Sequence, residues 1–126
     1  MNDLKEVLDG ILRVAEKSYD VRAIEPRLKD LVSLLGISPG RHEEFLSVLL
    51  SLLDPAPKEL QLGQPGIVEI LEYSMHRLRW PEVREAIQGI ASTSVDWRVR
   101  RAAERVLEAY EDEWPGGEIY EAYREN

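Results

Sequence analysis

The chain has 126 residues, which is the length of one ordinary domain, and a chain of this length buries roughly two-thirds of its unfolded surface. Sixteen Lys and Arg residues against 24 Asp and Glu residues give a net charge of −8, which argues against general nucleic-acid binding and against an anionic membrane surface. Because the sequence has no cysteine, disulfides, thiolate catalysis and cysteine-ligated zinc are excluded.

Two amphipathic helices are predicted first. The apolar residues between Leu4 and Ala15 recur at i, i+3, i+4 and i+7, the spacing of a helix that buries one face. Pro26 is predicted at the first position of a second helix, because its fixed φ suits the first turn and its missing N–H costs nothing there. Residues 20–25 are predicted as a helical turn before it, and Gly36 is predicted to follow its last residue.

The third predicted helix is the most apolar one. It begins at Ser38-Pro39, an N-cap followed by a first-turn proline, and runs to about Leu53. Apolar residues occupy more than one of its sides, and such a helix belongs in the centre of a domain. The proline-rich residues 54–57 end it, and residues 58–64 are predicted as the longest loop.

Three further helices are predicted in the second half. The fourth follows Gln64-Pro65-Gly66, the fifth starts at Pro81, and the sixth follows Asp96 as its N-cap. Residues 118–124 are predicted to add a short helical turn. Since no segment alternates with the period of a strand, the predicted fold class is all-α. We expect a single compact domain of about six helices over residues 1–126, with a helical N-terminal part (1–57) and a second part (64–126).

One motif resembles a known family. The run from Asp96 to Ala103, followed by Leu107, resembles the second helix of a HEAT-type repeat, with an Asp at the turn, Val-Arg, an alanine pair and a spaced Leu. A partial copy between Trp80 and Ile90 lies one helix earlier, whereas a HEAT unit spans about 40 residues. The resemblance implies that residues 67–110 form HEAT-like helical hairpins but not a true repeat array. It also implies that the faces of these hairpins bind other proteins.

Each of the two segments has a tryptophan near the start of its helix, Trp80 and Trp97, and both are predicted to wedge between neighbouring helices.

Chemical motifs are few. Glu69, Glu72 and His76 share one side of the fourth predicted helix, as metal ligands would, but the facing Glu-x-x-His helix is missing. The alternative is a solvated Glu72–His76 pair. The sequence contains neither a Gly-x-Ser-x-Gly elbow nor a phosphate-binding loop. We therefore expect no enzymatic activity, no metal, no cofactor and no small-molecule substrate.

The arginines concentrate between residues 76 and 105, where seven Arg residues stand against four acidic ones. Pairs within one helix, such as Arg101–Glu104 and Arg105–Glu108, are predicted to account for them. The alternative is a nucleic-acid surface, and the acidic residues that flank it argue against that function because they repel phosphate.

The candidate binding surface is the acidic C-terminal end. Residues 108–126 hold seven acidic residues against Arg124 alone. Negative charge after the C-terminal end of a helix opposes its dipole, which indicates selection for something other than stability. Trp and Tyr are favoured interface anchors. The alternative is a solubilising tail with its tryptophan folded onto the core. The predicted partner-binding residues are Glu108, Glu111, Asp112, Glu113, Trp114, Glu118 and Tyr120.

In size, acidity and lack of catalytic motifs the chain resembles the immunity proteins of bacterial polymorphic toxin systems. The resemblance implies a protein that neutralises a basic toxin domain by stoichiometric binding through an acidic surface, with no nucleic acid and no membrane as partner. The alternative is a HEAT-like adaptor or scaffold with another protein partner. A cytoplasmic protein is expected, because the N-terminus lacks the features of a secretory signal and the longest apolar stretch, 45–53, is too short to span a bilayer.

Overall fold

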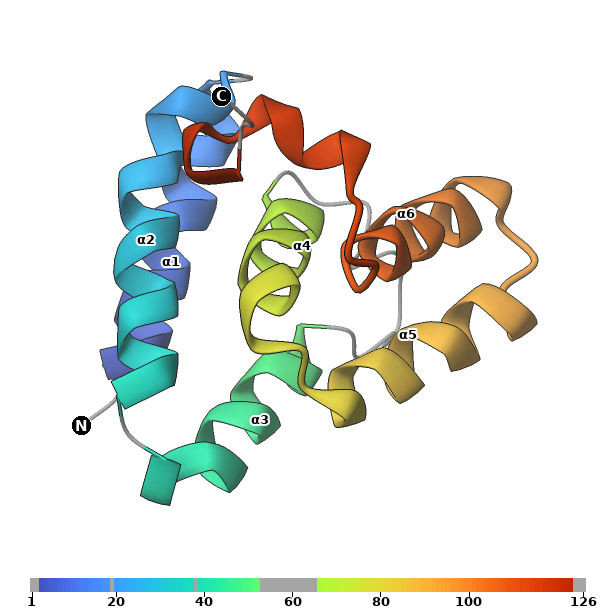
Figure 1. Ribbon diagram of the computed structural model, residues 1–126, viewed down its shortest axis with the longest axis horizontal. Helices are drawn as coiled ribbons and strands as arrows, with labels where there is room; N and C mark the ends of the chain where they lie inside the picture. The colour runs from blue at the N-terminus through green and yellow to red at the C-terminus, as the bar shows by residue number, and fades with distance from the viewer. Residues whose placement is uncertain (1–2, 19, 38, 53–65, 124–126) are drawn as a thin grey trace.

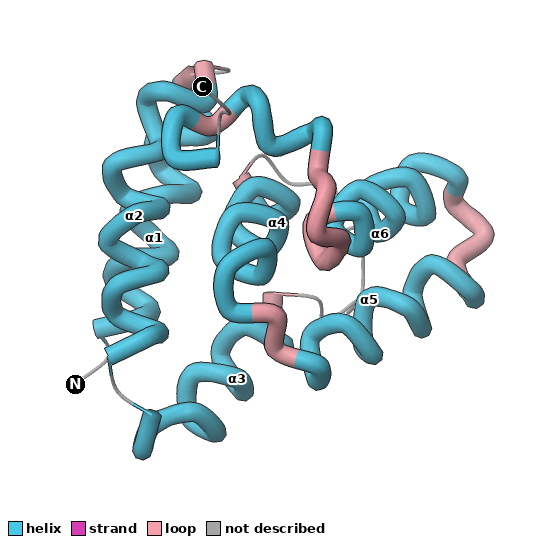
Figure 2. Tube along the Cα trace, in the orientation of Figure 1, coloured by secondary structure: helices cyan, strands magenta, loops and turns pink. Residues whose placement is uncertain are grey.

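The computed structural model describes residues 3–18, 20–37, 39–52 and 66–123, and in these residues it is all-helical, with six α-helices and no strand. The predicted all-α class is therefore confirmed (Figure 2). The elements are α1 (Asp3–Lys17), α2 (Val21–Ile37), α3 (His42–Ser51), α4 (Ile67–Leu78), α5 (Pro81–Thr93) and α6 (Trp97–Glu108), with the short 3-10 helices η1 (Pro39–Arg41), η3 (Pro115–Ile119) and η4 (Glu121–Tyr123).

The helices form two antiparallel pairs on either side of a central helix (Figure 1). α1 packs along α2 at one end of the molecule, and α5 packs along α6 at the other. α4 lies between the pairs and contacts α1, α2 and α6, while α3 contacts α1 and α5. The segment after α6 crosses back over α4 towards α2 (Figure 1). None of the described helices is long and apolar enough to cross a membrane.

The central helix is α4, so the prediction that the third helix occupies the centre is wrong. In α3 only Phe45 and Leu49 are buried. α4 is surrounded on several sides, and for this reason it buries polar as well as apolar side chains. Its buried residues are Ile67, Val68, Ile70, Leu71, Glu72, Tyr73, Ser74 and Met75.

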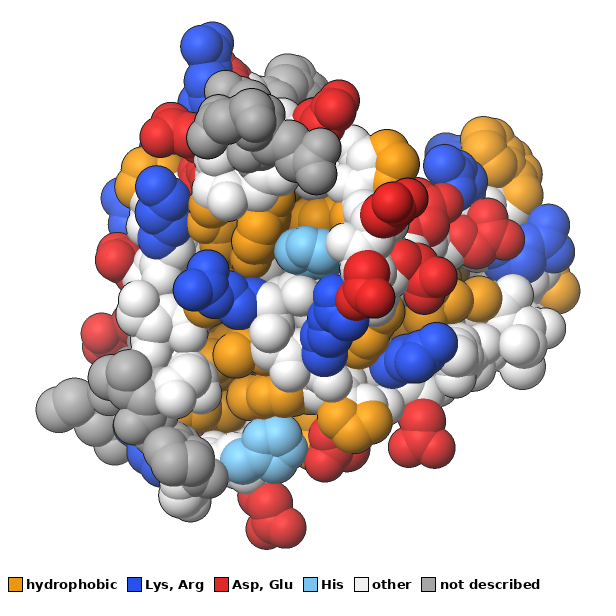
Figure 3. Space-filling model, in the orientation of Figure 1, with side chains coloured by type: hydrophobic (Ala, Val, Ile, Leu, Met, Phe, Trp, Pro, Cys, Tyr) orange, Lys and Arg blue, Asp and Glu red, His pale blue; other side chains and the backbone are white. Residues whose placement is uncertain are grey.

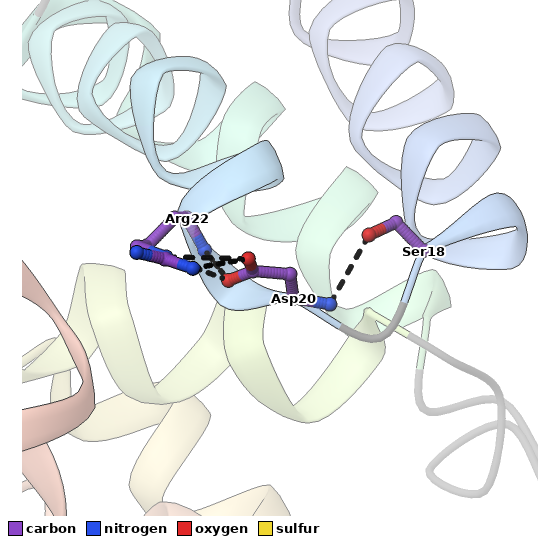
Figure 4. A network of polar contacts seen from close by, with 3 residues as sticks. All are labelled: Ser18, Asp20 and Arg22. Carbon is purple, nitrogen blue, oxygen red and sulfur yellow. Dashed lines mark hydrogen bonds and ion pairs between the residues drawn. The ribbon is translucent and has the colours of Figure 1, made fainter.

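The second helix begins five residues earlier than its proline predicted. Asp20 caps α2: its Oδ1 accepts a hydrogen bond from the Arg22 N–H at 2.9 Å, and its own N–H donates to Ser18 Oγ at 3.1 Å (Figure 4). Pro26 therefore lies inside the helix. There it removes the N–H that would bond to the carbonyl of Arg22. The extra turn buries Ile24, which offsets that loss.

The later helix starts are as predicted. Pro81 is the first residue of α5, and Asp96 caps α6 by accepting a hydrogen bond from the Arg98 N–H at 2.9 Å. The third helix opens with the single 3-10 turn η1 before α3. The predicted stop at 54–57 and the predicted loop at 58–64 lie outside the described residues.

Candidate functional site

Five predicted site residues form an exposed cluster at the C-terminal end. We call it the acidic surface; it consists of Glu108, Glu111, Asp112, Glu113 and Glu118, all of which are exposed. Acidic side chains gather over the end of α6 and the segment that follows it (Figure 3). The structure therefore brings together the carboxylates that the sequence analysis singled out.

The two predicted aromatic anchors lie in the core instead. Trp114 is 9% exposed and Tyr120 is fully buried. The Trp114 indole lies against the His76 ring, with centroids 4.7 Å apart, and Gly117 lies so close to it that an added Cβ would be 2.7 Å from the indole Cε3. Trp114 and Tyr120 thus belong to the core and do not project as anchors, so an interface at this end depends mainly on the carboxylates.

A cavity of about 450 Å³ opens between the acidic surface and the aromatic cluster beneath it. His76 marks its inner wall; its Nδ1 donates to the Ala109 carbonyl at 2.7 Å, and its ring contacts Tyr123 edge to face at 4.8 Å. Carboxylates on one side and aromatic rings on the other suit a cationic side chain. The lining residues are His76, Asp112, Glu113, Trp114, Pro115, Glu118 and Tyr123.

Of the three residues weighed as metal ligands, Glu69 and Glu72 pair with Arg105, and His76 does not. Glu72 is 1% exposed and accepts two hydrogen bonds from Arg105, at 2.9 and 2.8 Å, and one from the Tyr120 hydroxyl. Burial raises the pKa of the Glu72 carboxyl, against the opposing effects of Arg105 and Tyr120. The predicted solvated Glu72–His76 pair is therefore wrong. Within the described part of the chain, no three His, Cys, Asp or Glu residues form a group that could hold a metal.

A second buried carboxylate fixes the segment that carries the acidic surface. Glu25 of α2 is 4% exposed, and its carboxylate accepts hydrogen bonds from the backbone N–H groups of Glu121 and Ala122 at 2.8 and 2.9 Å. The Tyr123 hydroxyl donates to the Tyr73 carbonyl of α4 at 2.7 Å. These contacts tie the C-terminal end of the segment, residues 121–123, to α2 and α4, and its other end continues from α6.

The arginines are paired differently from the prediction. The Arg101–Glu104 pair within α6 is confirmed at 3.7 Å, and Arg101 also reaches Glu108 at 3.3 Å. Arg105 turns to Glu72 of α4 instead of Glu108, because a buried carboxylate needs a compensating charge more than an exposed one does. At the edge of the acidic surface, Arg79 pairs with Asp112 at 2.9 Å.

Trp80 and Trp97, which were both predicted to wedge between helices, differ in environment. Trp80 is half-buried and packs against the His42 ring, with ring centroids 4.3 Å apart. Its backbone carbonyl accepts a hydrogen bond from the Tyr110 hydroxyl at 2.7 Å. Trp97 is 65% exposed, so the prediction that it wedges between helices is wrong. It lies nine residues, or about two and a half turns, before the buried Val106 and therefore points to the opposite side of α6.

No family model, no curated protein and no solved structure matches the chain.

Proposed function

We propose that this protein is a non-enzymatic protein-binding module that recognises a basic protein partner through the acidic surface. The observation that carries the proposal is the exposure of the five carboxylates of the acidic surface, three of which, Asp112, Glu113 and Glu118, line an aromatic-walled cavity on a segment tied to α2 and α4. Five acidic residues against the two arginines that pair with them, Arg79 and Arg101, leave this surface with an excess of negative charge, which attracts a partner of the opposite sign.

The binding step follows from this geometry. Long-range attraction to the carboxylates would speed the encounter, and a Lys or Arg side chain of the partner would then enter the cavity. There Asp112, Glu113 and Glu118 supply negative charge, and the side chains of Trp114 and Tyr123 form part of the wall. Since Trp114 and Tyr120 belong to the core, specificity comes from charge placement and from the shape of the cavity.

In its most specific form the proposal is that of an immunity protein, which occludes a basic cleft of a toxin domain by one-to-one binding. A HEAT-like adaptor with another basic partner would use the same surface. The two differ in one assay: co-expression with the partner restores growth only if the partner is toxic and this protein neutralises it.

The test is a matched pair of charge reversals. Partners are captured from the native host with the immobilised protein, identified by mass spectrometry and purified for binding kinetics. The triple variant Glu111→Lys, Asp112→Lys, Glu113→Lys should slow association about tenfold or more, because steering is lost. The control variant Glu6→Lys, Asp9→Lys, Glu16→Lys makes the same change in net charge on exposed positions of α1. Equal association rates for both variants would refute the proposal.

A further inference from the structure

Two large apolar side chains are exposed at the far end of the α5–α6 pair. Val95, in the loop between these helices, is 96% exposed, and Trp97, the first residue of α6, is 65% exposed. Figure 1 places this loop at the end of the molecule opposite α1 and α2, and Figure 3 shows hydrophobic and basic side chains together there. Exposed apolar groups concentrated at one point are typical of a contact site.

The loop that presents these side chains is well ordered by hydrogen bonds. The Asp96 N–H donates to Ser94 Oγ at 3.2 Å, while the Asp96 carboxylate caps α6. The Arg100 guanidinium donates to the Ser94 carbonyl at 3.4 Å. The turn therefore holds Val95 outward as a fixed feature, and a fixed apolar group binds at a lower entropic cost than a mobile one.

The charge at this end is the opposite of the charge of the chain as a whole. No residue from 86 to 95 is charged, and the nearest carboxylate, Asp96, is occupied as the cap of α6. Arg98 follows Trp97 directly, and Arg100 lies three residues after it, one turn along the helix. These two arginines give the tip a positive charge in a protein with a net charge of −8.

We propose that the α5–α6 tip, defined by Val95, Trp97, Arg98 and Arg100, binds an acidic segment of a partner protein that carries an apolar side chain. The apolar residue would cover Trp97 and Val95, and the carboxylates would pair with the two guanidinium groups. A short acidic segment fits better than an anionic membrane, because an extended negative surface would also repel the remainder of this acidic protein. This surface is independent of the acidic surface, which requires a basic partner.

The test is selection from a phage-displayed library of random dodecapeptides on the immobilised protein. We expect one enriched class in which acidic residues flank an aromatic or aliphatic residue. Trp97→Ala, and separately Arg98→Glu with Arg100→Glu, should each weaken binding of these peptides at least tenfold in fluorescence anisotropy. Two matched controls should leave binding unchanged: Ile119→Ala, which removes an exposed apolar side chain elsewhere, and Lys5→Glu with Arg13→Glu on α1. Circular dichroism establishes that each variant is folded.

Three outcomes would overturn the proposal. The first is that the enriched peptides bind the tip variants as tightly as the wild type. The second is co-sedimentation with phosphatidylserine vesicles that depends on Trp97, which would assign the tip to a membrane. The third is a concentration-dependent dimer abolished by Trp97→Ala, which would assign it to a second copy. Basic peptides that lose binding only in the Glu111, Asp112, Glu113 variant report on the acidic surface, so the two proposals fail separately.

Discussion

The Tyr120 hydroxyl donates a hydrogen bond to the Glu72 carboxylate, which is buried in the central helix. Both oxygens of that carboxylate are occupied, because Arg105 of α6 donates to each of them. One buried charge is thus compensated by groups from α6 and from the segment after it. The position of the acidic surface depends on this contact, since Tyr120 lies in the segment that carries it.

Removal of the Tyr120 hydroxyl should therefore be costly. We expect Tyr120→Phe to lower the free energy of unfolding by about 1.5–3 kcal/mol, the range for a hydrogen bond to a charged group. Tyr123→Phe removes a hydroxyl that donates to a neutral carbonyl and should cost about 0.5–1.5 kcal/mol. Urea denaturation of the two variants measures this difference, and an equal or reversed order would show that the Glu72 contact is unimportant.

The buried tyrosines predict an alkaline transition. Burial raises the pKa of Tyr123 from 10.0 to about 12, and burial also raises the pKa values of Tyr73, Tyr110 and Tyr120. The folded state therefore keeps protons that the unfolded state releases near pH 10. The stability that the buried Tyr123 contributes is fully present below pH 10 and is lost as the pH rises from 10 to about 12, and the contributions of the other three tyrosines also begin to fall above pH 10.

Absorbance at 295 nm measures this ionisation, and circular dichroism at 222 nm measures the helix content over the same range of pH. We expect these four tyrosines to ionise only as the helix signal falls, whereas in guanidinium chloride they should ionise near pH 10. Ionisation of all tyrosines near pH 10 with an unchanged helix signal would contradict the burial of these side chains.

Local signals explain which parts of the fold could be predicted. Pro81 and Asp96 each mark a helix start, because their effect depends only on the next few residues. The same reasoning failed at Pro26, where Asp20 supplies the cap and tertiary burial of Ile24 outweighs the proline. The prediction that α3 lies at the centre of the domain was wrong for a related reason: the number of apolar residues on a helix does not show how many helices surround it.

The candidate site was predictable as a charge pattern but not as a geometry. The five carboxylates of the acidic surface are close in sequence, so their clustering needs no tertiary information. The burial of Tyr120 depends on Glu72, which lies 48 residues away, and no local pattern indicates that contact. The sequence analysis missed the exposure of Trp97 because the repeated motif suggested that this side chain packs between helices. The position of Trp97 on α6, on the side opposite the buried Val106, could have indicated its exposure.

Two glycines should respond oppositely to the same substitution. Gly89 lies in α5 with no atom within 4 Å of an added Cβ, so Gly89→Ala should stabilise the protein by about 0.5–1 kcal/mol. At Gly117 the added Cβ would lie 2.7 Å from the Trp114 indole, which must then move. Thermal unfolding should give a higher Tm for the first variant and a lower Tm for the second. A neutral Gly117→Ala would show that Trp114 can shift within its site.

The last prediction concerns α3, which the sequence placed in the centre and the structure places against α1 and α5. Leu49 is fully buried despite this peripheral position, so Leu49→Ala should leave a cavity and cost about 2–5 kcal/mol. Ser47→Ala on the exposed side of the same helix is the control and should change the free energy of unfolding by less than about 0.5 kcal/mol. Urea denaturation measures both. If Leu49→Ala costs less than about 1 kcal/mol, the apolar side of α3 does not contribute to the core and is instead available to a partner.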